Sequence, residues 1–253
     1  MGSAAERARA PEVSHRLLRG FMRYVEPYLR RHFHAVRLAR TGAPPLLAQD
    51  EPLVIYLNHP SWWDPLIGLL LSQRLFPERR HYSPIQAEAL TRYAFFARLG
   101  FFGLEPGTVH GARRFLAISE DLLSQGGTLW LTPGGRFSDP RERPAPLAPG
   151  LGHLAARLRR GTLLPLAVEY PFWEERFPEA LLRFGEPFVL GSPDGAARTA
   201  QGWTELLAAR LAATQDALAK DAVSREASRF ETLLGGRAGV GGVYDLWRRL
   251  KAR

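Results

Sequence analysis

The stretch LVIYLNHPSWWD, residues 53–64, joins a short apolar run to a polar turn and to the expected start of a helix. Five consecutive apolar residues that end at turn residues are typical of a strand buried on both faces. Similar strand candidates follow at 128–132, 163–168 and 181–184. Segments with helical spacing separate the strands, at 66–75, 111–124 and 151–160. This alternation predicts an α/β fold, with a mixed, largely parallel sheet flanked by helices.

Further segments complete the expected order of elements. Short strands are expected at 34–40, 81–85 and 188–190, and a short apolar segment lies at 101–104. Helices are expected over 88–99, where Gly100 is a stop signal, and over 200–234. The inward positions expected on the long helix are Trp203, Leu206, Leu207, Leu211, Leu218 and Phe230. Ser61 or Asp64 is expected to cap the helix at 66–75, because short polar side chains bond to free N–H groups at helix starts.

The N-terminal region is basic and amphipathic. Apolar residues recur at near-helical spacing over 13–33, with arginines between them. Pro27 predicts a kink or the start of a second helix. Basic amphipathic helices are typical of membrane surfaces, although a helix packed on the domain with solvated arginines fits the pattern equally well. The expected division is a disordered lead and membrane-surface helices at 1–32, one α/β domain at 33–234, and a glycine hinge with a basic C-terminal helix at 235–253.

The composition narrows the possible functions. The 253 residues contain no cysteine, which excludes disulfides, thiolate metal sites and a cysteine nucleophile. The net charge is +9, carried almost wholly by arginine, and Lys220 and Lys251 are the only lysines. Such charge suits anionic lipid or phosphate-bearing ligands, or reflects codon bias, and no nucleic-acid motif accompanies it. No apolar run approaches the ~20 residues of a membrane span. We therefore expect a cytoplasmic protein, peripheral to the inner face of the cell membrane.

His59 and Asp64 are the candidate catalytic residues. His59 directly follows the buried strand, in the region where α/β folds gather functional side chains, and Asp64 comes five residues later. A carboxylate bonded to one ring nitrogen fixes the tautomer and makes the other nitrogen a base for a hydroxyl proton. Trp62 and Trp63 supply apolar walls beside the pair. A hydrogen-bonded pair with only a structural role is the alternative.

Four segments resemble a known family in their order and spacing. Asn58-His59-x-x-x-x-Asp64 after a hydrophobic strand resembles the first motif of the glycerolipid acyltransferase superfamily, the PlsC-like enzymes. Gly100-Phe101-Phe102 resembles the start of the second motif, TPGGRFS at 132–138 resembles the third, and LPLAV at 164–168 resembles the fourth. The similarity spans roughly residues 33–190.

The resemblance implies a glycerol-3-phosphate acyltransferase-like α/β fold and acyl transfer from acyl-CoA or acyl carrier protein to a hydroxyl of a lipid acceptor. In this family the histidine is the general base and the aspartate supports it, so these roles fall to His59 and Asp64. The resemblance also implies that no covalent acyl-enzyme forms and that no metal or bound cofactor is expected. The substrate-binding positions that we assign are Asn58, Trp62, Trp63, Pro133, Gly134, Gly135 and Arg136.

The sequence departs from the family pattern at acceptor-binding positions. Glu105 stands where the second motif has a phosphate-binding arginine, and Gly134 and Phe137 replace a glutamate and an arginine of the third. Arg136, or Arg113 and Arg114, could compensate. A phosphate acceptor is therefore in doubt, and a lysophospholipid with a larger head group, an aminolipid or a glycosylated isoprenoid becomes plausible. A non-catalytic lipid-binding protein and a thioester hydrolase are the remaining alternatives.

Overall fold

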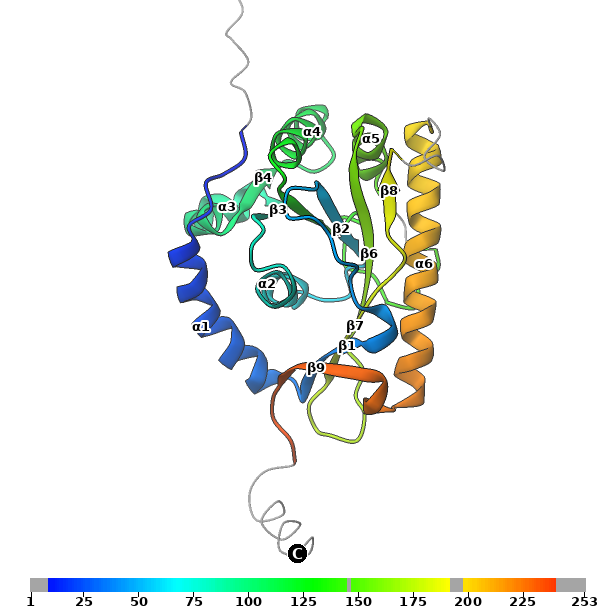
Figure 1. Cartoon of the computed structure of the whole chain (residues 1–253). Helices are drawn as coiled ribbons and strands as arrows, with labels where there is room; N and C mark the ends of the chain where they lie inside the picture. The colour runs from blue at the N-terminus through cyan, green and yellow to red at the C-terminus, as the bar shows by residue number, and fades with distance from the viewer. Residues whose placement is uncertain (1–8, 145–146, 192–197, 240–253) are drawn as a thin grey trace, which may run out of the picture.

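A mixed sheet forms the centre of the molecule (Figure 1). The computed structural model describes residues 9–144, 147–191 and 198–239. Within them the sheet has nine strands in the order β4-β3-β5-β2-β6-β7-β1-β9, and β8 pairs with β6. The strands are β1 Ala35–Ala39, β2 Leu53–Leu57, β3 His81–Gln86, β4 Phe101–Leu104, β5 Thr128–Leu131, β6 Gly161–Glu169, β7 Glu179–Phe184, β8 Phe188–Leu190 and β9 Phe230–Gly235.

Most strand pairs in this sheet are parallel. β2 lies between β5 and β6 and is parallel to both, with Ile55 opposite Trp130 on one side and Leu164 on the other. β7 and β8 run antiparallel to β6, and β9 runs antiparallel to β1. The mixed, largely parallel sheet predicted from the sequence is confirmed. β2 has the bounds that its apolar run predicts, and all five of its residues are buried.

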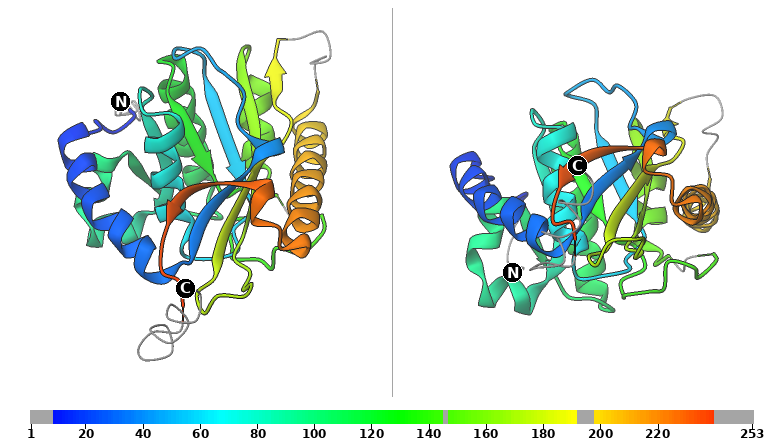
Figure 2. Two further views of the ribbon diagram at one scale, coloured as in Figure 1. Left: turned by 60° about the horizontal axis from the view of Figure 1, so that its bottom comes forward. Right: turned by 90° about the horizontal axis from the view of Figure 1, so that it is seen from below.

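Helices cover both faces of the sheet. They are α1 His15–His32, α2 Asp64–Leu75, α3 Ala87–Arg92, α4 Val109–Ser124, α5 Gly150–Arg157 and α6 Ala200–Ser224, with 3-10 turns at Arg40–Gly42, Ala94–Leu99 and Ala227–Arg229. α1 and α2 pack on one face, and α4, α5 and α6 cover the other. Figure 2 shows α1 and α6 on opposite sides of the sheet when the molecule is seen from below.

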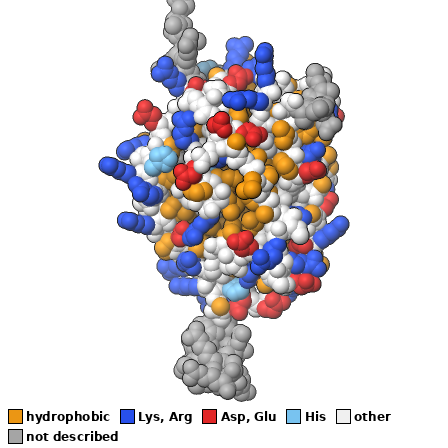
Figure 3. Space-filling view, in the orientation of Figure 1, with side chains coloured by type: hydrophobic (Ala, Val, Ile, Leu, Met, Phe, Trp, Pro, Cys, Tyr) orange, Lys and Arg blue, Asp and Glu red, His pale blue; other side chains and the backbone are white. Residues whose placement is uncertain are grey.

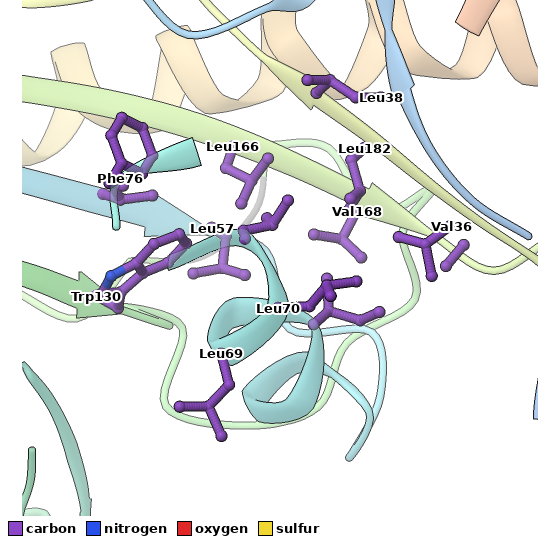
Figure 4. Packing of buried hydrophobic residues seen from close by; sticks show 14 of the residues in the cluster. Val36, Leu38, Leu57, Leu69, Leu70, Phe76, Trp130, Leu166, Val168 and Leu182 are labelled. Carbon is purple, nitrogen blue, oxygen red and sulfur yellow. The ribbon is translucent and has the colours of Figure 1, made fainter. Parts of the chain in front are cut away.

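The core between α2 and the sheet holds the end of β2 in place. In Figure 4 the side chains of Leu57 and Val168 point from β2 and β6 toward Leu70 of α2. Leu70 and Val168 are fully buried, and Leu57 is 5% exposed. Each such side chain stabilises the fold by about 1.5–3 kcal/mol relative to an exposed position. The start of α2 is therefore fixed close to the residues that follow β2.

The N-terminal region forms one helix, so of the two outcomes predicted at Pro27, a kink or the start of a second helix, the second is wrong. Pro27 lies inside α1 and is exposed, so its ring occupies the solvent side of the helix. Proline removes one backbone hydrogen bond. Buried side chains on both sides of it, among them Met22 and Leu29, pack into the core and hold both halves of the helix there.

Two predicted helix details also differ from the structure. α2 begins after Trp63 with no side-chain cap, so neither Ser61 nor Asp64 caps it; Asp64 is its first residue and bonds to His59 instead. The helix predicted over 88–99 is interrupted at Tyr93, whose φ of −127° and ψ of 66° lie outside the helical region. Gly100 follows in the left-handed region with φ 98°, where the absence of a side chain lets it approach the His81 carbonyl.

The helix predicted over 200–234 ends ten residues early. α6 stops at Ser224, because Arg225 adopts the left-handed conformation with φ 54°. Phe230 is buried as predicted, but it begins β9, which pairs with β1. Gly235, expected in a hinge, is the last residue of that strand. The C-terminal helix predicted over 244–253, part of the glycine hinge and residues 1–8 of the N-terminal lead lie outside the described residues.

Candidate active site

The carboxyl ends of three neighbouring parallel strands meet at one edge of the sheet. β2 lies between β5 and β6, so the segments that follow these strands lie side by side. In α/β folds this edge is where functional side chains gather. Asn58 and His59 follow β2, residues 132–136 follow β5, and Tyr170 follows β6.

Asn58 ties the end of β2 to β6. Its Nδ2 donates to the carbonyl of Val168 and its Oδ1 accepts from the Val168 N–H, each at 2.9 Å. The side chain is buried. Both polar ends of the amide are thus used within the protein, and Asn58 fixes the path of the chain immediately before His59. Its contact with substrate stays a prediction.

His59 and Asp64 lie in direct contact, as their spacing predicts. His59 Nδ1 is 2.5 Å from Asp64 Oδ2, and the N–H of Ser61 donates to the same oxygen at 3.2 Å. Asp64 is only 3% exposed. Its position at the N-terminus of α2 favours a negative charge, because the free N–H groups of a helix start carry partial positive charge.

Tyr170 belongs to the same cluster, although the sequence analysis did not single it out. Its hydroxyl donates to Asp64 Oδ1 at 2.6 Å. Burial, followed by the neighbouring charge of Asp64, raises the pKa of Tyr170 well above its ordinary value, so the hydroxyl remains a proton donor. A signal was present: Tyr170 follows a predicted buried strand, as His59 does. That signal points to Asp64 only once β6 is known to lie beside β2.

The bond at Nδ1 determines what His59 can do. An ionised carboxylate only accepts hydrogen bonds, so Nδ1 carries a proton and Nε2 of the neutral ring is the acceptor. The His59 side chain is 19% exposed, which leaves the ring open to a ligand. This arrangement can take a proton from a hydroxyl group and return it to a leaving group.

Phe137 covers one side of the imidazole. Its ring centroid lies 4.4 Å from that of His59, and the ring is 57% exposed. The Ser138 N–H donates to the His59 carbonyl at 3.0 Å, which holds the loop after β5 over the end of β2. An accessible apolar surface therefore stands beside the candidate base.

The predicted substrate-binding residues 133–136 form a turn at the same edge. Gly135 has φ 66°, which side chains rarely adopt, and its N–H donates to the Thr132 carbonyl at 3.0 Å. Arg136 Nη2 lies 2.8 Å from Glu142 Oε1, and both side chains are exposed. The turn is thus near His59, while the guanidinium of Arg136 is paired with a carboxylate of the same loop.

The other two arginines that the sequence offers as compensation lie on the first turns of α4. Arg113 and Arg114 are exposed, and Arg114 Nε donates to the Gly103 carbonyl at 3.3 Å. Glu105 is exposed too, and its carbonyl accepts from the hydroxyl of Thr108, the residue that caps α4. These contacts do not involve His59 or Asp64. The contact at residue 105 uses its backbone carbonyl and does not involve the carboxylate.

Trp62 and Trp63 lie between the candidate base and α1. Their rings stack with centroids 4.3 Å apart. Trp63 packs against Phe33 at 4.9 Å and against Tyr28 at 5.5 Å. Trp62 is 53% exposed and leaves apolar surface open to solvent. The two rings thus connect the site to the exposed side of α1.

Glu169, the last residue of β6, is a further titratable group at this edge. Burial raises its pKa to about 7, and the positive charge of Arg143 opposes the shift. This carboxyl group is therefore partly protonated near neutral pH. A glutamate at a strand end carries no distinctive pattern, so the sequence alone does not indicate this group.

Comparison with protein-family models shows the family to which the chain belongs. A model described as acyltransferase matches residues 37–169, more than half of the chain, and the match includes His59 and Asp64. The chain belongs to the acyltransferase family. The PlsC-like assignment made from the four motifs is thereby confirmed. A search of curated proteins found no match to this acyltransferase.

Among residues 9–144, 147–191 and 198–239, no group of three or more histidine, aspartate or glutamate side chains could hold a metal ion. Over the same ranges, no helix is both long enough and apolar enough to cross a membrane.

Proposed function

We propose that the protein transfers a fatty acyl group from acyl-CoA or acyl carrier protein to a hydroxyl group of a lysophospholipid-like or other lipid acceptor. His59 is the general base and Asp64 supports it. The observation that carries the proposal is the 2.5 Å contact between His59 Nδ1 and buried Asp64, at the carboxyl end of β2 and inside the acyltransferase match.

The mechanism needs no covalent acyl-enzyme. His59 Nε2 takes the proton of the acceptor hydroxyl while its oxygen attacks the thioester carbonyl carbon. Asp64 stabilises the imidazolium that forms, because its carboxylate stays bonded to Nδ1. The C–S bond then breaks, and the thiolate leaves with the proton that His59 returns. The products are an ester and a free thiol.

The surroundings of His59 favour an acceptor other than a phosphate monoester. Phe137 places an apolar ring 4.4 Å from the imidazole, and Arg136 is engaged with Glu142. An apolar ring provides no positive charge for a phosphate. We propose a lysophospholipid with a larger head group, an aminolipid or a glycosylated isoprenoid as acceptor, with the acyl chain against Trp62 and Trp63.

We also propose that α1 docks the enzyme on anionic lipid at the cytoplasmic face of the membrane. Five of its arginines are exposed: Arg16, Arg19, Arg23, Arg30 and Arg31. Figure 3 shows basic side chains along the edge of the molecule where α1 runs. Tyr24 is 57% exposed on the same helix. Arginines beside an exposed aromatic ring are typical of an interfacial helix.

Vesicle binding tests this docking. Replacing Arg16 and Arg19 with glutamine should weaken binding to phosphatidylglycerol vesicles about tenfold or more, since each basic residue near an anionic surface contributes about 1 kcal/mol. Wild-type binding should also weaken as salt is added. The matched control replaces Arg159 and Arg160, which are exposed beyond the end of α5 on the other face of the sheet. Equal losses in the two variants would contradict a role specific to α1.

Product analysis tests the reaction. Wild-type protein is incubated with a panel of acyl-CoA and acyl carrier protein donors and with total membrane lipid, and the lipid products are identified by mass spectrometry. An acylated lipid that depends on both the acceptor and His59 is the expected result. Thiol release without an acceptor would indicate hydrolysis instead. No release with any donor would favour a non-catalytic lipid-binding protein.

A further inference from the structure

Three donors from two segments converge on the buried carboxylate of Asp64. His59 and Ser61 both lie in the connection between β2 and α2, and Tyr170 follows β6, 106 residues beyond Asp64 in the chain. A charged carboxylate buried this deeply is stable only when its oxygens are bonded. The three contacts fulfil that requirement without a positively charged partner.

The two carboxylate oxygens have different partners. Oδ2 accepts from His59 and from the Ser61 N–H, whereas Oδ1 accepts from Tyr170. The terminal torsion of an aspartate is broad, so a bond to one oxygen alone leaves the carboxylate free to rotate. The hydroxyl of Tyr170 fixes the second oxygen. With both oxygens held, the direction of Oδ2 toward the imidazole is set.

The position of Tyr170 is set before any ligand binds. β6 is paired in register with β2 up to Leu57 and Leu166, and Asn58 clamps Val168. Tyr170 follows two residues later, and its ring packs 5.6 Å from that of Phe33. Strand pairing and ring packing thus deliver the hydroxyl to Asp64. A hydroxyl held in this way loses little entropy when it bonds to the carboxylate.

We propose that Tyr170 is a positioning residue of the acyltransferase: its hydroxyl holds Asp64 so that the carboxylate orients the His59 imidazole for proton removal. The expected effect of Tyr170 on kcat rests on the proposed acyl transfer. Its expected effect on structure, a fixed His59 ring, holds in the protein without substrate. The two consequences can be measured separately.

Tyr170→Phe tests the proposal, because it removes the hydroxyl and keeps the ring. We expect kcat to fall about ten- to a hundredfold, the range that corresponds to one lost hydrogen bond to a charged group. KM for donor and acceptor should stay unchanged, because the residue acts through Asp64. The matched control is Tyr56→Phe: that hydroxyl is buried with no partner among the described residues, on the face toward α4 to α6. The control should keep the wild-type kcat.

A second readout does not depend on activity. In wild-type protein the His59 Nδ1 proton should give a slowly exchanging low-field proton NMR signal. Tyr170→Phe should speed its exchange with water, and Tyr56→Phe should not. Absence of transfer by wild-type protein would contradict the proposed function, while the exchange comparison would still decide the role of Tyr170. Unchanged exchange in Tyr170→Phe, whatever its kcat, would overturn the positioning role, as would an unchanged kcat in an active enzyme.

Discussion

Two histidine–carboxylate pairs lie at the same edge of the sheet, with the same short distance between the imidazole Nδ1 and a carboxylate oxygen. His59 Nδ1 is 2.5 Å from Asp64, and His34 Nδ1 is 2.5 Å from Glu179. The second pair lies at the starts of β1 and β7, and since β7 is antiparallel to β6, its start lies beside the end of β6. In both pairs the carboxylate is buried and the imidazole is partly exposed, with 19% for His59 and 23% for His34.

The other partners of the two carboxylates differ. The second oxygen of Glu179 accepts from Arg37 Nε at 2.9 Å, and Arg37 also donates to Thr232 of β9. The charge of Glu179 is therefore balanced by a guanidinium that joins three strands. Asp64 is held by neutral donors, Ser61 and Tyr170, so its charge acts on His59. The two pairs thus share a short contact and differ in the remaining partners of the carboxylate.

The largest expected effect is that of Asp64→Asn. The amide keeps the shape of the side chain but no longer fixes the proton on Nδ1, so kcat should fall about a thousandfold or more, as in other enzymes with a carboxylate-supported histidine. Steady-state kinetics of acyl transfer measure the loss, and circular dichroism checks the fold. A kcat within tenfold of wild type would contradict the role of Asp64.

Glu179→Gln makes the same chemical change in the other pair. It leaves Arg37 with a neutral partner in a site where the Glu179 side chain is 2% and the Arg37 side chain 11% exposed. The free energy of unfolding should fall by about 3 kcal/mol, as measured by urea denaturation. The kcat of the folded protein should match that of wild type. A large loss of kcat with unchanged stability would reverse the roles of the two pairs.

A third histidine, His81, has no carboxylate partner within the part of the chain that the structure describes, and its pH dependence extends the comparison. Burial lowers its pKa from 6.5 to about 4, and the ring bonds to the Phe76 carbonyl and the Trp130 indole. Below pH 6.5 the His81 side chain of the unfolded chain becomes protonated, whereas in the folded protein it accepts a proton only near pH 4. The free energy of unfolding should therefore fall by about 2 kcal/mol between pH 7 and pH 5, with most of the loss below pH 6.5.

His81→Gln is the control for this pH dependence. Glutamine offers a neutral donor and acceptor, so the variant should be less stable than wild type at pH 7 but should lose this part of the slope. Urea denaturation at several pH values between 7 and 5 measures both quantities. An equal slope in the two proteins would assign the acid sensitivity to other groups.

Features set by neighbouring residues were predictable from the sequence. β2 follows directly from five apolar residues, and the approach of Asp64 to His59 follows from a five-residue turn between a strand and a helix. The role of Tyr170 was not predictable, because it depends on β6 lying beside β2, which the chain order does not state. The predicted catalytic role of His59 and Asp64 remains to be tested by activity.

Features set by distant contacts were missed for the same reason. Residues 230–235 continue a helical pattern, yet they form β9 because β1 offers free backbone groups nearly 200 residues away in the sequence. Pro27 predicts a break on local grounds, yet buried side chains on both sides keep α1 in one piece. Long-range packing decided the outcome in both cases.

The central claim is that only one of the two histidine–carboxylate pairs performs acyl transfer, and parallel kinetics of His59→Ala and His34→Ala test it most directly. Both variants remove an imidazole from a buried carboxylate, and both are assayed with the donor and lipid acceptor identified for the wild type. We expect His59→Ala to lose transfer by at least about a thousandfold while remaining folded, and His34→Ala to keep the wild-type kcat. Retained transfer in His59→Ala, or an equal loss in both variants, would contradict the account.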